Sequence, residues 1–258
     1  MTGEFSATWL ELREPADAAA RAADLPGLLR LDPPVVVRDL GCGTGSLGRW
    51  LAPRLPHPQR WILQDRDPEL LAHAAATVPA QSVDTHLGDA TVLTADDLAG
   101  TSLVTCSALL DLFTADEVDR IAAALAAART PALFTLSVVG DVAFDPPDEL
   151  DAAVAGAFDD HQRRTTGGRR LLGPDASEVA TAALTRHGAR VIARPSPWRL
   201  GPDRRALAAE WLRGWTGAAA EQRPELPVPA YLERRLAAVE AGAVTITVGH
   251  EDLLVQFD

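Results

Sequence analysis

The chain has 258 residues, of which 47% are hydrophobic and 23% charged, and its formal net charge at pH 7 is −12. These values are typical of a soluble globular chain that is long enough to build a three-layer core. The acidic balance disfavours nucleic acid and anionic membranes as partners, because both would be repelled. We expect no membrane span and no signal peptide, and therefore a cytoplasmic location.

The first half of the chain alternates between helix-like and strand-like segments. Apolar residues at helical spacing, beginning with Phe5, predict a helix over 5–23. Short apolar runs then predict strands at 35–40, 60–65, 82–89, 103–106 and 131–139, with helical segments at 47–55, 67–78 and 114–129 between them. Asp67 is expected to cap its helix, and Thr114 with Glu117 forms a capping box. The alternation predicts an α/β fold with a mostly parallel, Rossmann-like sheet and helices on both faces.

After Gly140 the regular alternation breaks. A helix is predicted at 148–164, followed by further elements that are helical at 177–188, 203–222 and 229–242 and extended at 190–198 and 244–249. We interpret residues 1–258 as a single domain, with a cofactor-binding core at about 33–140 and inserted cap helices at about 141–175 and 201–242. The late tryptophans, which are Trp198, Trp211 and Trp215, are expected to pack these helices, and one of them could line an acceptor pocket. The same helices suggest a homodimer surface.

The segment VVVRDLGCGTGSLG, residues 35–48, is the most informative part of the chain. It predicts a strand that carries Asp39, then a tight turn with glycines at 41, 43 and 45, then the start of a helix. Such a turn lets backbone N–H groups approach a small ligand closely. Gly43–Gly48 also matches GxGxxG, so a nicotinamide-dependent oxidoreductase is an alternative. Asp39 disfavours it, because a carboxylate repels a pyrophosphate but attracts an ammonium group.

Two further acids fall at strand ends. Asp65 ends the second predicted strand and Asp89 the third. In parallel sheets, ligands bind beyond the carboxyl ends of the strands, where Asp39, Asp65 and Asp89 would meet.

Taken together, these motifs resemble the class I S-adenosylmethionine-dependent methyltransferases of the small-molecule type, over about residues 35–139. The resemblance implies S-adenosyl-L-methionine as cofactor and S-adenosyl-L-homocysteine as product. It also implies that the methionine part lies against the glycine turn, that Asp65 accepts the ribose hydroxyls, and that Asp89 and Ala90 contact the adenine. The full set of implied cofactor residues is Asp39, Gly41, Cys42, Gly43, Gly45, Asp65, Arg66, Asp89, Ala90, Cys106 and Ser107.

Two residues are candidate catalytic groups. Asp111 follows the fourth strand and could accept a proton from the acceptor, although it could equally cap the next helix. His161 shares the apolar face of the 148–164 helix, where a histidine is more often a buried structural residue. The arginine-rich segment 163–170 is interpreted as a solvated loop, with a mobile lid over an anionic acceptor as the alternative.

The sequence offers no metal-binding pattern, because the two cysteines and six histidines lack ligand spacing. We therefore expect transfer of a methyl group to an oxygen, nitrogen or carbon atom of a small-molecule acceptor, with no nucleic-acid or membrane partner. A non-catalytic protein that binds the cofactor as a scaffold is the second alternative.

Overall fold

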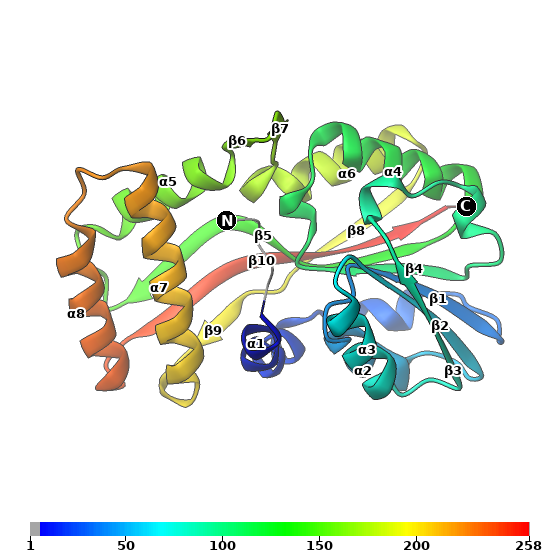
Figure 1. Ribbon diagram of the computed structural model, residues 1–258, viewed down its shortest axis with the longest axis horizontal. Helices are drawn as coiled ribbons and strands as arrows, with labels where there is room; N and C mark the ends of the chain where they lie inside the picture. The colour runs from blue at the N-terminus through cyan, green and yellow to red at the C-terminus, as the bar shows by residue number, and fades with distance from the viewer. Residues whose placement is uncertain (1–5, 258) are drawn as a thin grey trace.

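The computed structural model describes residues 6–257, so Phe5, the first residue of the predicted N-terminal helix pattern, lies outside the described residues. Its centre is one eight-stranded sheet (Figure 1). The strands are β1 (Val35–Leu40), β2 (Gln59–Asp65), β3 (Ser82–Leu87), β4 (Leu103–Ser107), β5 (Ala132–Asp145), β8 (Arg190–Pro195), β9 (Trp198–Leu200) and β10 (Thr245–Gln256). A separate short hairpin consists of β6 (Thr165–Thr166) and β7 (Arg169–Arg170).

The strand order is β3-β2-β1-β4-β5-β10-β8, with β9 paired to β10. The five strands from β3 to β5 are parallel, whereas β10 runs antiparallel to both β5 and β8. The chain order reverses between β1 and β4, because β1 lies between β2 and β4. Such a switch point opens a crevice at the carboxyl ends of the strands, and small ligands bind there in open α/β sheets.

Helices cover both faces of the sheet (Figure 1). The helices are α1 (Ala7–Ala20), α2 (Ser46–Leu51), α3 (Pro68–Thr77), α4 (Ala115–Ala128), α5 (Asp151–Gln162), α6 (Ala176–Arg186), α7 (Arg205–Gln222) and α8 (Val228–Glu240). Residues of α4 and α6 share one buried apolar cluster with the sheet, and residues of α2 and α3 share another on the opposite face. The predicted Rossmann-like α/β fold is therefore confirmed.

Local sequence signals account for the starts of two helices. The Asp67 carboxylate accepts hydrogen bonds from the Glu69 and Leu70 amides at the beginning of α3. Thr114 and Glu117 form the reciprocal capping box of α4. Both caps satisfy backbone N–H groups that a helix start otherwise leaves without partners, and both are as predicted.

The second half of the sheet differs from the prediction in length. β5 continues to Asp145, beyond the predicted boundary at about residue 140, and β10 runs to Gln256 instead of ending near Gly249. The strand predicted over 190–198 is two strands, because Ser196 and Pro197 interrupt it. The long antiparallel pair of β5 and β10 carries the sheet outward to α5, α7 and α8 (Figure 1).

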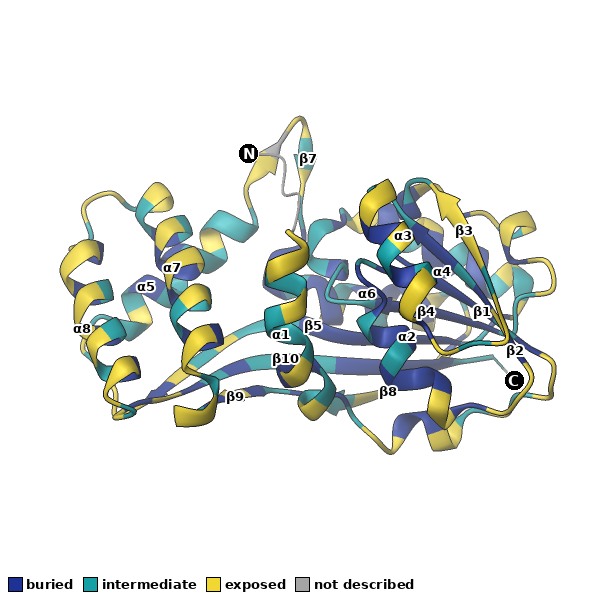
Figure 2. Cartoon of the chain, turned by 60° about the horizontal axis from the view of Figure 1, so that its bottom comes forward, coloured by how far each residue is buried: buried dark blue, intermediate teal, exposed yellow. Residues whose placement is uncertain are grey.

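The cap helices have an apolar core of their own. Trp198 and Trp215 are buried in it, together with Phe144 from β5 and Tyr231 from α8. Because these two tryptophans pack inside the protein, they are not free to form a dimer surface, and a homodimer stays a prediction. At the other end of the sheet β3 is an exposed edge strand (Figure 2).

Candidate active site

A cavity of about 910 Å³ lies beyond the carboxyl ends of β1, β2 and β4. Its wall is formed by the loops that follow these strands and by the loop after β3, with Arg13 and Asp17 of α1 on another side. Of the residues implied by the sequence, the cavity is lined by Asp39, Gly41, Cys42, Gly43, Asp65, Arg66, Asp89, Ala90 and Ser107. The topology thus brings together residues from four separate strand ends.

The glycine turn after β1 is shaped by left-handed backbone conformations. Gly41 and Gly43 have φ values of 61° and 53°. A Cβ atom on Gly41 would lie 2.5 Å from Leu109 Cδ2, so a side chain there would force the wall to move. The turn therefore needs glycine at position 41 both for its backbone conformation and for space.

Gly45 has a packing role at the start of α2. It does not line the cavity, and it begins α2 with φ at 86°. A Cβ atom there would lie 2.9 Å from Val78 Cγ2 and 3.1 Å from Ala74 Cβ. Gly45 therefore allows close packing of α2 against α3, and cofactor contact by Gly45 stays a prediction.

Asp39 is buried at the end of β1, with only 1% of its surface exposed. One carboxylate oxygen accepts a hydrogen bond from Thr105 Oγ1 at 2.7 Å, and the other has no partner among the described residues. Burial raises the pKa of Asp39 to about 6, although the hydrogen bond from Thr105 and the charge of Arg21 oppose this. An unpartnered buried carboxylate oxygen in the cavity wall suits a cationic ligand group.

Asp65, at the end of β2, fastens the glycine turn. Its carboxylate accepts hydrogen bonds from the Gly43 amide at 2.8 Å and from the Asp67 amide at 3.0 Å. Each carboxylate oxygen can accept a second hydrogen bond. Asp65 can therefore hold the turn and still receive hydroxyl groups of a ligand.

Asp89 lines the far side of the cavity with Ala90. Its carboxylate accepts two hydrogen bonds from Thr91 at 2.8 Å and pairs with Arg66 at 2.5 Å. Burial opposes ionisation, but the hydrogen bonds from Arg66 and Thr91 hold the pKa of Asp89 below its usual value. The ion pair with Asp89 holds the Arg66 side chain at the cavity wall.

The side chains of Cys106 and Ser107, at the end of β4, point in opposite directions, because successive side chains alternate along a strand. The Cys106 side chain is 2% exposed and packs in the core, where burial raises the pKa of its thiol, and it does not line the cavity. The implied cofactor contact by Cys106 stays a prediction. Ser107 does line the cavity, and its hydroxyl accepts a hydrogen bond from Arg21 Nη2 at 3.2 Å.

Arg21 is a charged residue behind this wall that sequence reasoning missed. It follows α1, is 3% exposed, and also donates to Ser46 Oγ at 3.1 Å. Its Nε and Nη1 atoms have no partner among the described residues. Burial lowers the pKa of Arg21, against the favourable charges of Asp17, Asp252 and Asp39. A lone arginine in an alanine-rich helical stretch carries no sequence signal of burial.

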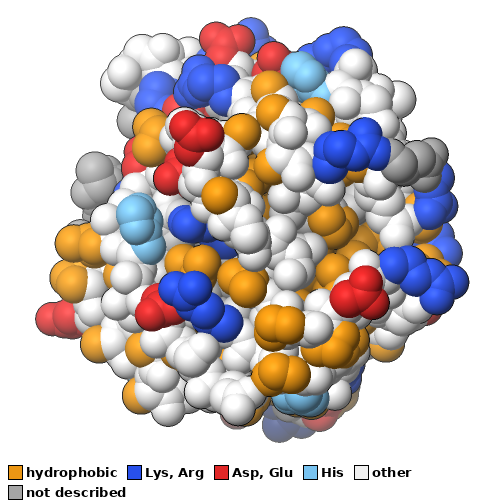
Figure 3. Space-filling view, turned by 90° about the vertical axis from the view of Figure 1, so that its right-hand side faces the viewer, with side chains coloured by type: hydrophobic (Ala, Val, Ile, Leu, Met, Phe, Trp, Pro, Cys, Tyr) orange, Lys and Arg blue, Asp and Glu red, His pale blue; other side chains and the backbone are white. Residues whose placement is uncertain are grey.

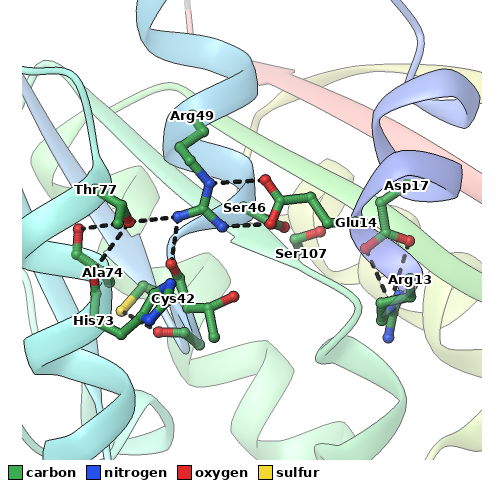
Figure 4. A network of polar contacts seen from close by, with 12 residues as sticks. Arg13, Glu14, Asp17, Cys42, Ser46, Arg49, His73, Ala74, Thr77 and Ser107 are labelled. Atoms are coloured by element: carbon green, nitrogen blue, oxygen red, sulfur yellow. Dashed lines mark hydrogen bonds and ion pairs between the residues drawn. The ribbon is translucent and has the colours of Figure 1, made fainter. Parts of the chain in front are cut away.

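A second polar network joins the glycine turn to its neighbouring helices (Figure 4). Arg49 of α2 donates to the Thr44 carbonyl and to Thr77 Oγ1, both at 2.6 Å. It also pairs with Glu14 of α1, through a 2.7 Å hydrogen bond from its Nε. The turn is therefore held from both sides, by α1 and by α3.

A second cavity of about 410 Å³ adjoins the first, and the two share the wall residues Arg13, Ala108, Leu112, Arg164 and Leu171. Ala108 follows β4 with φ at 51°, a left-handed conformation that is unusual for alanine. Both candidate catalytic residues, Asp111 and His161, line this second cavity and not the first. Burial raises the pKa of Asp111 to about 6.

The two candidate catalytic residues differ in their partners. His161 Nε2 lies 3.1 Å from a carboxylate oxygen of Glu221 on α7, and its ring also contacts Arg164. The Asp111 carboxylate forms no ion pair or side-chain hydrogen bond with any other described residue. His161 thus links the cap helices, whereas Asp111 is free to interact with a ligand.

The arginine-rich segment 163–170 forms the β6–β7 hairpin and its approach. Arg163 pairs with Asp175 at 2.7 Å, and Arg169 pairs with Glu117 at 2.6 Å. These ion pairs agree with the interpretation of a loop whose charges balance nearby acids. Arg164 and Arg169 nevertheless border the first cavity.

Charges are also interspersed on the surface. Acidic, basic and hydrophobic side chains all occur on the end of the molecule drawn in Figure 3, and neither sign of charge covers it. Among residues 6–257, no group of three or more His, Cys, Asp or Glu side chains is arranged to hold a metal ion. No helix in the described part of the chain has the length and apolar character needed to cross a membrane.

The fold and the first cavity define a cofactor-binding α/β protein with its site at the switch point of the sheet. Residues 37–132 match the model of a family described as a methyltransferase domain. The chain therefore contains a methyltransferase domain over these residues.

Solved structures share the fold at low sequence identity. The cyclopropane synthase MmaA2 from Mycobacterium tuberculosis matches with a TM-score of 0.52 and 13% identity, over 98% of this chain and 95% of that chain. The mycolic acid cyclopropane synthase CmaA1, solved with S-adenosylhomocysteine and CTAB, matches with a TM-score of 0.50 and 14% identity, over 90% of this chain and 82% of that one. No curated protein matches the chain.

Proposed function

We propose that the protein transfers a methyl group from S-adenosylmethionine to a small-molecule acceptor that lies in the second cavity. The observation that carries this proposal is the shared wall at Ala108 and Leu112. A two-substrate transfer needs the two reactants to meet in a fixed orientation with water excluded. Two adjoining cavities, one at the strand-end crevice and one lined by residues of α1, β5, α5, α7 and β10, meet this need.

The residues of the first cavity fit the chemistry of the cofactor. The unpartnered oxygen of Asp39 would receive the ammonium group of the methionine part. Asp65 would accept the ribose hydroxyls while it holds Gly43. Asp89 and Ala90 would contact the adenine. The dinucleotide alternative fits less well, because the buried charge of Asp39 would face a pyrophosphate.

S-adenosylmethionine, when bound, supplies an electrophilic methyl group. The acceptor must present a lone pair, and the proton it gives up needs a base. Asp111 would be this base, since its carboxylate has no other partner and lies in the second cavity. His161 would hold α5 to α7 through Glu221, so its substitution should affect stability more than the chemical step.

A crystal structure of the S-adenosylhomocysteine complex tests the proposal. We expect the sulfur atom to lie beside Ser107 and Ala108 and to face the second cavity. A complex in which the sulfur is separated from that cavity by the wall would contradict the two-cavity proposal, even if the cofactor were bound.

A further inference from the structure

The second cavity is lined by a histidine with one ring nitrogen that has no hydrogen-bond partner among the described residues. His250 of β10 is 5% exposed, and its Nδ1 lies 3.0 Å from the Val248 carbonyl oxygen. Because a carbonyl oxygen can only accept, Nδ1 carries the proton and Nε2 is left with a lone pair. No described residue donates to Nε2, and His250 lines the cavity. Burial lowers the pKa of His250 to about 3, so the ring stays neutral.

The same cavity contains three carboxylates, those of Asp111, Asp141 and Asp159. None of them forms an ion pair or a side-chain hydrogen bond with another described residue. The Asp159 carboxylate occupies space that Gly140 leaves open, since a Cβ atom at Gly140 would lie 2.9 Å from Asp159 Oδ2. Burial raises the pKa of Asp159 to about 6, although the charge of Arg163 opposes this.

The nearby cationic residues form no ion pair with these acids, although the charge of Arg13 acts on Asp111 and that of Arg163 acts on Asp159. Arg13 pairs with Asp17 at 3.0 Å and lies 4.9 Å from the ring centroid of Trp198. Arg164 is exposed and contacts the His161 ring. Asp111, Asp159 and His250 Nε2 therefore line the cavity as acceptors without an ion-pair or side-chain hydrogen-bond partner among the described residues.

The remaining wall is apolar and includes four aromatic side chains. Trp9, Phe158, Trp198 and Trp211 line the cavity, drawn from α1, α5, β9 and α7. Aromatic faces attract both apolar groups and cations, and the attraction to cations grows when water is excluded. This wall suits a ring-sized apolar body and also tolerates a positive charge beside it.

We propose that the acceptor is an amine with an apolar, ring-sized body, bound as its ammonium form between the unpartnered acceptors of the second cavity. The inference rests on the proposed function, because it names the substrate class of that same site. A carboxylate or phosphate ligand would be repelled by Asp111 and Asp159. An alcohol could fill the space, but it would donate only one hydrogen bond and bring no charge to the carboxylates.

The protons balance without a further reactant. The ammonium group transfers one proton to the Asp111 carboxylate and becomes a neutral amine with a lone pair on nitrogen. The nitrogen–carbon bond forms as the sulfur–carbon bond breaks, and the electron pair of the broken bond leaves with sulfur. The product is a methylated ammonium ion and S-adenosylhomocysteine, and Asp111 returns its proton to solvent when the product leaves.

Three matched probes test the substrate class: 2-phenylethylamine, 2-phenylethanol and phenylacetate. Each is titrated calorimetrically into the protein saturated with S-adenosylhomocysteine. We expect the amine to bind at least about tenfold more tightly than the alcohol, since a charge-assisted hydrogen bond is stronger than a neutral one, and phenylacetate to bind more weakly than either. Equal binding of the amine and the alcohol, or preferential binding of phenylacetate, would overturn the inference.

Two variants test which residues recognise the amine. Asp111→Asn and Asp159→Asn remove the charges at nearly constant size, and we expect each to reduce the amine-over-alcohol preference. Asp160→Asn is the matched control on α5, because Asp160 is exposed and pairs with Arg223 at 2.6 Å; it should leave the preference unchanged. A preference that survives in the Asp111→Asn, Asp159→Asn double variant would overturn the assignment. A failure to bind S-adenosylhomocysteine would instead contradict the proposed function.

Discussion

The carboxylate of Asp65, at the end of β2, accepts a 2.8 Å hydrogen bond from the backbone amide of Gly43, which lies in the turn after β1. The residue that would receive the ribose therefore also fixes the turn that would receive the methionine part. A carboxylate bound to a backbone amide keeps lone pairs for a ligand. Cofactor affinity should then depend on Asp65 in two ways, through direct contact and through the shape of the turn.

Replacing Asp65 with alanine should weaken S-adenosylhomocysteine binding by about 10- to 100-fold, because hydrogen bonds to a charged group contribute about 1.5–3 kcal/mol each. Calorimetric titration measures the change. Thr114→Ala is the control, since it removes the cap of α4, lies outside the cavity lining, and should cost about 1 kcal/mol of stability with little effect on binding. An unchanged affinity in Asp65→Ala would refute the ribose assignment.

Asp39 should make cofactor binding depend on pH. Its carboxyl group must be ionised to attract the ammonium group, and burial raises its pKa to about 6 in the free protein. The affinity for S-adenosylhomocysteine should therefore fall as the pH drops below about 6, by up to about tenfold per pH unit. In Asp39→Asn the affinity should be lower and this dependence should disappear. A wild-type profile that is flat between about pH 5 and 7 would contradict the role of Asp39.

The same group should affect the stability of the free protein. Because the folded-state pKa of Asp39 is above its unfolded value of 3.8, its contribution to stability is full below pH 3.8 and is lost as the pH rises through about 6. Thermal melts should therefore shift in favour of Asp39→Asn, relative to wild type, as the pH rises from about 4.5 to 7. A constant difference between the two melting temperatures would contradict this reasoning.

Alanine substitutions at Gly43 and Gly45 should have different effects on folding stability and on cofactor affinity. Gly45→Ala combines a left-handed φ with close contacts to Val78 and Ala74, and should cost about 2–5 kcal/mol of folding free energy. Gly43→Ala meets only Leu10 Cδ1, at 3.2 Å, and should cost less stability but more cofactor affinity, because Gly43 lines the cavity. Denaturant titration and calorimetry measure the two effects. The opposite ranking would contradict the roles assigned to these glycines.

Asp111→Asn should lower the rate of methyl transfer by about 10²–10⁴-fold while leaving S-adenosylhomocysteine affinity unchanged, because it removes the base but touches only the second cavity. Since the base must be ionised, the wild-type rate should rise with pH through about 6, and the variant should lack this rise. The rate is measured as the formation of S-adenosylhomocysteine, with the amine that binds best as the methyl acceptor. Asp116→Asn, at an exposed position of α4, is the control.

The first half of the molecule could be predicted from local signals in the sequence. Strands end in Asp39, Asp65 and near Asp89, and parallel pairing brings these ends to one edge, so the acids line one cavity. Caps at Asp67 and Thr114 depend on residues within one helical turn. Each of these features follows from residues that are close in sequence, or from the rule for parallel sheets.

The second cavity could not be predicted in this way, because it depends on pairing between distant segments. β10 is irregular opposite β5, with register shifts between Val248 and His250 and between Glu251 and Leu253. Bulges re-aim side chains, and His250 lies at this irregularity. Asp252 stabilises it by accepting hydrogen bonds from the Leu136 amide at 2.8 Å and from Ser196 Oγ at 2.6 Å. No local pattern in the sequence marks these contacts.

Calorimetric titration of the wild-type protein with S-adenosylhomocysteine, with NAD and NADP titrated in parallel, tests the central claim most directly. We predict that S-adenosylhomocysteine binds with a dissociation constant of about 1–100 μM, a free energy of about −8 to −5 kcal/mol, and that neither dinucleotide binds. Binding of a dinucleotide alone would contradict the account, because the buried carboxylate of Asp39 would then face a pyrophosphate and not an ammonium group.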